Sequence, residues 1–429
     1  MPLGVDYKLV DLAARPEPAP EPAEEGEPAV PELPAGVYNS IRQAINDGGG
    51  TIVLKPGVYE EPVLLEKGER IVSLRSAREL LGDAGDDLPL SSEEQGPAEV
   101  RAYCFHAVSM MGDAELLDVT VQQRGPGRWF AVLCAEGAPK LTKCEVACAT
   151  SSCIGVCGGA EPIIAGCTVH GSEFGNGIAV FDQGKGTVSE CEIFGNAHSG
   201  VDVDGDGSEL TLERCNISRN RGDGILIRSQ GKVTATENKV YNNFHGGIEL
   251  RDNAKVEARE NEISGNNFGV IISKGSTAAL EGNKICRNYV TGVEVSRSPA
   301  VTDECPVTLL QDNLIECNLE SGVKVWYQGA AKLDSNKVQA NLQEMQISPR
   351  SRRGVTYEMP EEVPDGASRP KFGTNVICDA EELLEQRREV ERASRIAKAE
   401  EAARAANASE VEGGPEEAAA AEPAPADGA

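Results

Sequence analysis

A repeat of about 23 residues runs through most of the chain and limits what it can fold into. These repeats are 22–24 residues long, except for one step of 30 residues. One position in each repeat holds a cysteine or an asparagine: Cys144, Cys167, Cys191, Cys215, Asn238, Asn261, Asn283, Asn313 and Asn336. A β-branched residue follows two positions after each of them, and another asparagine follows five positions after seven of them. A glycine then precedes an apolar-x-apolar triplet, as in Gly224-Ile225-Leu226-Ile227.

This repeat predicts an all-β solenoid. Leucine-rich repeats have a similar period, but their Leu-x-x-Leu-x-Leu signature is absent. No segment inside a repeat is long enough for a crossover helix, so each coil must stack on the next through parallel strands about 4.8 Å apart. The predicted fold is a single-stranded right-handed parallel β-helix. Its predicted core includes Val201, Val203, Ile217, Ile225, Ile227, Ile248 and Ile263.

Two ladders of equivalent residues explain the repeat. Stacked asparagines can hydrogen-bond to one another and to the turn backbone. Glycine adopts left-handed turn geometry without a Cβ penalty, so the glycine ladder is expected to mark left-handed turns. The 30-residue step predicts a loop around residues 299–306 that leaves the coil.

The repeat also sets the predicted domain boundaries. The solenoid is expected over residues 37–348, after a disordered Pro- and Glu-rich tail at 1–36. Residues 38–48 predict a short helix that ends at glycine and caps the first coil, with Ile41 and Ile45 on one face. An acidic loop is expected at 82–96, a linker at 349–378 and a disordered tail at 408–429.

A second helix is predicted over residues 379–407. Asp379 has the position of an N-cap, and Glu382 follows at the third helical position. Leu383, Val390 and Ala397 form a thin apolar stripe at seven-residue spacing. The helix is either mostly solvated, or a cap or partner-binding element.

Composition excludes some classes of protein. The formal net charge of −28 repels phosphate backbones, so a nucleic-acid partner is not expected. No apolar run is long enough for a membrane span, and no secretory signal is visible. An odd number of cysteines, 13, predicts free thiols in a reducing compartment, the cytoplasm or nucleus.

One predicted strand face carries an unusual group of charged residues. Residues between the inward-pointing apolar ones face outward on neighbouring coils. The predicted ligand-binding face comprises Asp202, Asp204, Arg228, Glu249, Arg251 and, further along, Trp326. It is either a solvated face crossed by ion pairs or a groove for a sugar or a peptide. Asp202 and Asp204 are neighbours on one strand and do not flank a scissile bond, so no catalytic residue is assigned.

Motifs for metals are weak in this sequence, and no metal or other cofactor is expected. Asp202, Asp204 and Asp206 match the start of a calcium loop, but they lie between strands rather than helices. Cysteines at 144, 148, 153 and 157 lack a tight Cys-x-x-Cys zinc knuckle. His198 and His245 share one repeat position two coils apart, and both are interpreted as turn residues.

The repeat resembles a known group of proteins. Segments such as residues 186–201, Gly-Thr-Val-Ser-Glu-Cys-Glu-Ile-Phe-Gly-Asn-Ala-His-Ser-Gly-Val, resemble the β-helix domain of F-box proteins. They also resemble the wider repeat family of carbohydrate-binding proteins and sugar hydrolases, over about residues 38–347. The F-box likeness implies substrate recognition in protein ubiquitination. Only a Pro-Glu-Ala tail precedes the repeats, however, so no F-box helical module is expected.

Two functional hypotheses follow. The first is a non-enzymatic β-helix scaffold that binds a protein or glycan partner on its outward strand face. The alternative is a carbohydrate-active enzyme, namely a polysaccharide lyase, hydrolase or epimerase. The same repeat hosts both kinds of protein, so it specifies the fold well and the function poorly.

Overall fold

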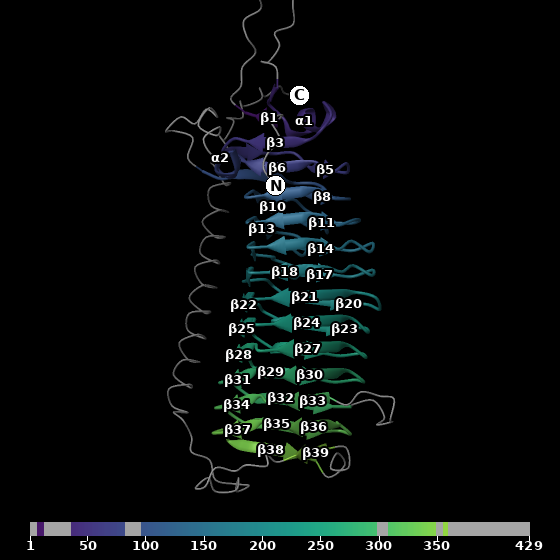
Figure 1. Ribbon diagram of the computed structural model, residues 1–429, viewed down its shortest axis with the longest axis vertical. Coiled ribbons are helices and arrows are strands. Elements are labelled where there is room, and N and C mark those ends of the chain that lie inside the picture. Colours follow the sequence, from purple (N-terminus) through teal and green to yellow (C-terminus); the bar gives the residue numbers. More distant parts are fainter. Residues whose placement is uncertain (1–6, 13–35, 82–95, 298–307, 349–354, 359–429) are drawn as a thin grey trace, which may run out of the picture. The chain divides into compact units, whose positions relative to one another are not determined.

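A computed structural model describes residues 7–12, 36–81, 96–297, 308–348 and 355–358. The chain divides into two units, Met1–Ile377 and Cys378–Ala429, and all described residues belong to the first. Short strands in this unit stack coil upon coil, as the ladder of arrows in Figure 1 shows. Each coil contributes one strand to each of three parallel sheets, here named A, B and C. The unit is therefore a parallel β-helix, as the repeat predicts.

Sheet A has fifteen strands and sheets B and C have twelve each. In spatial order, sheet A comprises β2 (Val37–Tyr38), β1 (Tyr7–Val10), β3 (Thr51–Leu54), β6 (Arg70–Ser73), β9 (Glu115–Leu117), β12 (Lys140–Thr142), β15 (Ile163–Ala165), β18 (Thr187–Ser189), β21 (Glu209–Glu213), β24 (Lys232–Thr236), β27 (Lys255–Arg259), β30 (Thr277–Glu281), β33 (Thr308–Gln311), β36 (Ala331–Asp334) and β39 (Val355–Glu358). Sheet B comprises β4 (Gly57–Tyr59), β7 (Ala98–Ala102), β10 (Thr120–Gln123), β13 (Glu145–Cys148), β16 (Thr168–His170), β19 (Glu192–Phe194), β22 (Asn216–Ser218), β25 (Lys239–Tyr241), β28 (Glu262–Ser264), β31 (Lys284–Cys286), β34 (Leu314–Glu316) and β37 (Lys337–Gln339). Sheet C comprises β5 (Val63–Leu65), β8 (Val108–Met110), β11 (Val132–Cys134), β14 (Ile154–Val156), β17 (Ile178–Val180), β20 (Val201–Asp204), β23 (Ile225–Arg228), β26 (Gly246–Leu250), β29 (Phe268–Ile272), β32 (Thr291–Ser296), β35 (Ser321–Trp326) and β38 (Gln343–Ile347).

The predicted core is confirmed. All seven apolar residues named for it are fully buried and belong to one continuous cluster that runs along the solenoid. Alternation explains this cluster, because each short strand buries every second side chain and equivalent positions stack on successive coils.

Two ladders hold the corners between the sheets. In the corner from sheet A to sheet B, the amide of Asn238 donates to Asn261 Oδ1 over 3.0 Å and to a backbone carbonyl over 2.9 Å. The cysteines of this ladder continue directly into its asparagines, because Cys215 N donates to Asn238 Oδ1. A second ladder in the corner from sheet B to sheet C repeats this pattern, as between Asn220 and Asn243. The stacked polar residues therefore satisfy buried backbone groups, as predicted.

The glycine ladder is present, but the predicted reason for it, a left-handed backbone conformation, is wrong. Gly200, Gly224 and Gly247 do not have left-handed backbone angles. A Cβ at Gly224 would instead lie 2.4 Å from Val240 Cγ1 and 2.8 Å from Asn243 Nδ2 on the next coil. Positive φ values fall on residues directly before the ladder asparagines, such as Glu237 (φ 55°) and Glu260 (φ 55°), and in the corner from sheet C to sheet A, as at Asp252 (φ 60°). Glycine is required at this ladder because the next coil leaves no room for a side chain.

The first coil is closed by a short helix, α1 (Ile41–Asn46). Ser40 caps it, and the Glu61 carboxylate accepts a hydrogen bond from Ile41 N over 2.7 Å. Ile41 and Ala44 are fully buried, and Ile45 packs against the core while partly exposed. The structure also contains a helix that was not predicted, α2 (Leu74–Leu81). Leu74 and Ala77 of α2 form a second small apolar cluster with β3 and β6.

The predicted boundaries of the solenoid are too narrow. β1 lies in the segment predicted as a disordered tail, yet it pairs with β3 and β2. At the other end β39, predicted as linker, pairs with β36. The loop around 299–306, most of the acidic loop at 82–96, the helix at 379–407 and the tail at 408–429 lie outside the described residues. No helix among the described residues is long and apolar enough to cross a membrane.

Candidate functional site

Asp202, Asp204 and Arg228 meet on the outer face of sheet C. β20 and β23 are adjacent strands, and Asp204 is the register partner of Arg228. The guanidinium of Arg228 lies between the two carboxylates, with Nη2 3.1 Å from Asp202 Oδ2 and 3.0 Å from Asp204 Oδ2. Asn176 Nδ2 also donates to Asp202, which is only 6% exposed. The hydrogen bonds that Arg228 donates to the Asp202 carboxylate raise the pKa of Arg228 further above its usual value.

One coil further on, His245 lies between two acidic residues. Its Nδ1 is 2.7 Å from Asp223 Oδ1 and 3.1 Å from Glu249 Oε2. Asp223 is buried and also accepts a hydrogen bond from Gly246 N over 2.7 Å. Hydrogen bonds to Asp223 and Glu249 raise the pKa of His245 to about 10, so its ring is an imidazolium at neutral pH. Arg251 lies nearby, with Nη1 3.8 Å from Glu249 Oε1.

The corner glycine explains how these three side chains reach one another. Asp223 lies one position before the ladder glycine Gly224, and His245 lies two positions before Gly247, the ladder glycine of the next coil. The side chains of both residues therefore project from the corner just before the strands of sheet C begin. Glu249 lies on β26 and points outward between the buried residues Ile248 and Leu250. The side chains of Asp223, His245 and Glu249 converge there with ligand-type atoms all within 4.8 Å of one another, close enough for a metal ion.

Sequence reasoning found part of this site and missed the rest. The outward positions of Asp202, Asp204, Arg228, Glu249 and Arg251 follow from strand alternation, and the structure places them on three adjacent coils. His245 was interpreted as a turn residue, and Asp223 was not singled out. A usable signal was present, because an acidic residue lies one position before the ladder glycine of one coil and a histidine lies two positions before that of the next.

Trp326 lies away from this group, on β35. Its Nε1 donates to Glu294 Oε1 over 2.8 Å, and Lys324 Nζ lies 5.0 Å from its ring centroid. Glu294 is on β32, which separates β35 from β29 and β26. Trp326 is thus tied to its own neighbours and does not contact the charged group.

The guanidinium of Arg228 already pairs with both carboxylates of the weak calcium candidate formed by Asp202 and Asp204. Arg228 occupies the space between Asp202 and Asp204, so a calcium ion there would have to displace a guanidinium. The cysteines considered for zinc are directed to backbone carbonyls instead. Cys148 Sγ donates to Trp129 O and Cys153 Sγ donates to His170 O. Burial raises the pKa of the nearby Cys134 thiol to about 12, as expected for a core thiol rather than a reactive one.

An aromatic strip lies beside the charged group on the same side of the solenoid. Trp129 and Phe105 pack with ring centroids 5.4 Å apart, and His106 stacks on Phe130 at 5.6 Å. The Phe130 ring covers Gly155 of β14, where a Cβ would lie 2.9 Å from it. Phe181, directly after β17, stacks on Phe130 at 6.0 Å. β17 is adjacent to β20, so the strip leads to the coil that carries Asp202 and Asp204.

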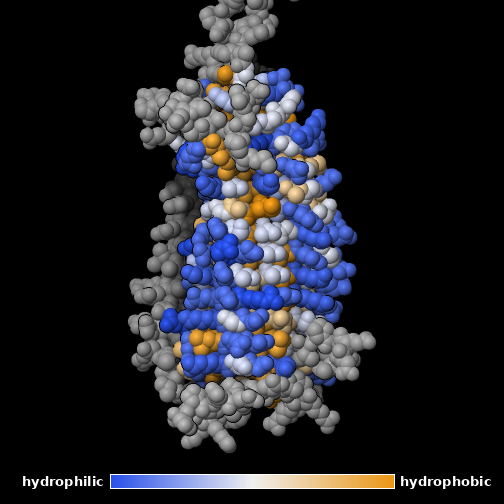
Figure 2. Space-filling view, viewed as in Figure 1, coloured by the Kyte–Doolittle hydropathy of each residue, from blue (hydrophilic) through white to orange (hydrophobic). Residues whose placement is uncertain are grey.

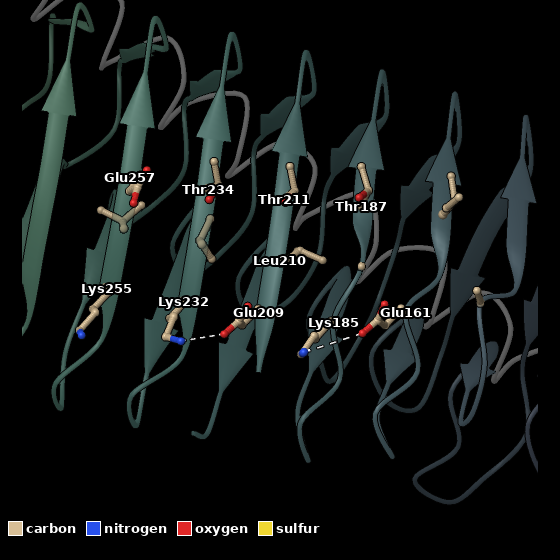
Figure 3. Close-up of a pocket in the computed structure, with 15 residues that line it drawn as sticks. Glu161, Lys185, Thr187, Glu209, Leu210, Thr211, Lys232, Thr234, Lys255 and Glu257 are labelled. Atoms are coloured by element: carbon tan, nitrogen blue, oxygen red, sulfur yellow. Dashed lines mark hydrogen bonds and ion pairs between the residues drawn. The ribbon is translucent and has the colours of Figure 1, made fainter. Parts of the chain in front are cut away.

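A separate shallow groove of about 570 Å³ lies on the outer face of sheet A. Figure 3 shows its side chains in rows, with a threonine row formed by Thr187, Thr211 and Thr234. Lys232 pairs with Glu209 at 2.7 Å and Lys185 pairs with Glu161 at 3.8 Å. Figure 2 shows this side of the unit as largely hydrophilic with a paler column near its middle. Most of the groove's charges are thus already paired, and it has no acid–base group like His245.

Comparison with protein families identifies the fold class. Residues 131–257 and 199–348 match the family model described as the right handed beta helix region, and together the matches cover half of the chain. The chain therefore belongs to the right-handed β-helix family. The more specific likeness to F-box proteins stays a prediction. No curated protein matches the sequence.

Solved structures that resemble this chain carry the names of enzymes that act on polysaccharides. The A-module of Azotobacter vinelandii mannuronan C-5 epimerase AlgE4 has a TM-score of 0.56 at 14% identity, covering 75% of this chain and 94% of that module. Pectate lyase Pel9A has a TM-score of 0.48 at 13% identity, covering 70% and 78%. These identities show the fold alone. The likeness to the epimerase module agrees with the fold of the carbohydrate-active hypothesis and lends no support to a role in ubiquitination.

Proposed function

We propose that the chain is a carbohydrate-active β-helix protein that binds a polysaccharide along the outer face of sheet C and transfers a proton on one of its sugars. The observation that carries the proposal is the contiguity of the aromatic strip with the charged group. Rings from Trp129 to Phe181 offer apolar faces, and the coils after β17 offer acids, bases and cations. Sugar rings present one apolar face and several hydroxyls, so they suit a surface of this kind.

The charged group has the parts needed for proton transfer beside a carboxylate. Lyases and epimerases both begin when a base removes the ring proton next to the sugar carboxyl group. The carboxylates of Asp223 and Glu249 can accept a proton, and the partly exposed imidazolium of His245 can donate one. Arg251 has one long ion pair to Glu249 and keeps other N–H donors for a sugar carboxylate. The name of the solved epimerase supports this substrate class, because mannuronan is a polymer of a uronic acid.

Solvent exchange tests the proposal directly. The purified chain is incubated with mannuronan or pectate in D₂O, and deuterium entry at the ring carbon is followed by NMR. Exchange should occur in the wild type and should fall by about 10²–10⁴-fold in His245→Ala, the usual contribution of an acid–base group. Phe130→Ala should weaken binding of the polymer with a smaller effect on the rate of exchange by the bound enzyme.

The groove on sheet A supplies the control. Lys232→Ala removes a paired lysine there and should change neither binding nor exchange. If the polymers bind but no deuterium enters and no chain is cleaved, the chain is a glycan-binding scaffold. If neither polymer binds, the assignment of sheet C as a glycan face is wrong.

A further inference from the structure

We propose that Asp223, His245 and Glu249 form a binding site for a first-row divalent metal ion, for which Zn²⁺ is the best fit. Each residue offers one ligand atom, and the three atoms lie within 4.8 Å of one another. The inference concerns the cluster on which the proposed function relies, but metal binding is measured without any glycan. Its failure would leave the proposed function standing.

The distances suit a metal of this size. Zinc binds imidazole nitrogen and carboxylate oxygen at about 2.0–2.2 Å, so neighbouring tetrahedral ligands lie about 3.3 Å apart. Nδ1 of His245 is already 3.1 Å from Glu249 Oε2 and 2.7 Å from Asp223 Oδ1. These two separations would open by about 0.2 Å and 0.6 Å to reach that value. The metal replaces the Nδ1 proton, which leaves to solvent, and no other bond changes.

The surroundings hold the ligands in place. Gly246 N donates to the Asp223 carboxylate over 2.7 Å, and Asp223 is 6% exposed. Arg251 lies beside the other oxygen of Glu249, and the His245 ring packs on Phe268 with centroids 5.8 Å apart. Such outer contacts fix the orientation of ligands at metal sites. Half-exposed His245 leaves one side of the cluster open, so the metal would keep a position for water or for a sugar oxygen.

The donor set decides the kind of metal. Calcium and magnesium take oxygen ligands almost alone, whereas imidazole nitrogen favours zinc and its neighbours in the first transition row. One nitrogen with two carboxylate oxygens therefore selects a borderline ion such as Zn²⁺ or Co²⁺. This distinguishes the cluster from the Asp202–Asp204 pair, which has oxygen donors and a resident arginine.

Metal titration of the full chain tests the inference. After treatment with a chelator, Zn²⁺ is titrated by calorimetry, and Co²⁺ is added in a second series to report its ligands by absorption. One equivalent should bind, and the Co²⁺ spectrum should lack the intense thiolate bands in the near ultraviolet. His245→Ala and Glu249→Gln should each weaken binding by about 100-fold or more, since they remove direct ligands.

A matched control is present in the same column of residues. His198 occupies the position of His245 two coils earlier and is exposed. His198→Ala should bind metal as the wild type does. Equal affinity in the His245→Ala variant, or a thiolate spectrum, would overturn the proposal, because the metal would then be held elsewhere, for instance by exposed Cys104. Circular dichroism of each variant shows whether the fold is kept.

Discussion

At the scale of single residues, the two corners that carry an asparagine ladder each use two neighbouring residues for two tasks. The first adopts a positive φ, as Glu260 does, and turns the chain. The second is the ladder asparagine, such as Asn261, which is 1% exposed. Its Oδ1 accepts from Asn238 N and Nδ2, and its own Nδ2 donates to Ala235 O and Asn283 Oδ1. A polar side chain is thus stable in the interior because all of its hydrogen-bonding groups are used.

Replacing Asn261 by leucine should lower the free energy of unfolding by about 1–3 kcal/mol, because Asn238 and Ala235 would lose buried partners. Chemical denaturation of the two proteins measures the difference. Asn261→Cys should cost less, since Cys215 shows that a thiol fits this ladder and joins its asparagines. An unchanged midpoint for the leucine variant would show that the ladder bonds do not stabilise the fold.

At the scale of elements, the carboxylate of Asp118 joins the start of α2 to the solenoid through hydrogen bonds. Asp118 accepts hydrogen bonds from the Ser73 and Ser76 hydroxyls and from Arg75, at the start of α2. Burial acts to raise the pKa of Asp118, but the hydrogen bonds from Arg75, Ser73 and Ser76 outweigh burial and lower it. Asp118 also has a φ of 55°, which asparagine tolerates well.

Asp118→Asn should therefore destabilise the protein by about 1–2 kcal/mol at neutral pH. The lowered pKa means that the carboxylate stabilises the fold fully above its ordinary pKa of 3.8 and loses this effect as pH falls through the lowered value. The stability of wild type and variant should converge in acid. Urea denaturation from pH 7 down to pH 3 measures this, and a constant difference over the range would contradict it.

At the scale of the whole molecule, a solenoid is stabilised mainly between neighbouring coils, and its ends need covers. α1 supplies one cover, with Ile41 fully buried in the core cluster. Substitutions there should act locally, whereas a globular domain would respond as one unit.

Ile41→Asp should open the first coils only. Hydrogen exchange should show lost protection in β1, β3 and β6 and retained protection in β21, β24 and β27, about six coils away. Gln43→Ala, on the exposed side of α1, serves as the control. Uniform loss of protection along all sheets would mean that the solenoid unfolds as a single cooperative unit.

The repeat was sufficient to predict the fold and much of the charged face. Ladder positions fix how many residues make one coil, and alternation then decides which side chains are buried, as Ile217 and Ile263 show. It also predicted that Asp202 and Arg228 would be neighbours, because a regular repeat converts distance along the chain into contact between coils.

Other features depended on the tertiary structure. β1 has no repeat signal, and its pairing with β3 joins segments about 40 residues apart. Asp223 and His245 lie at corners, where the direction of a side chain follows from the turn rather than from alternation, so their convergence on Glu249 could not be deduced from spacing. The glycine ladder was misread for the same reason, since the closeness of the next coil, not the backbone angle, excludes a side chain there.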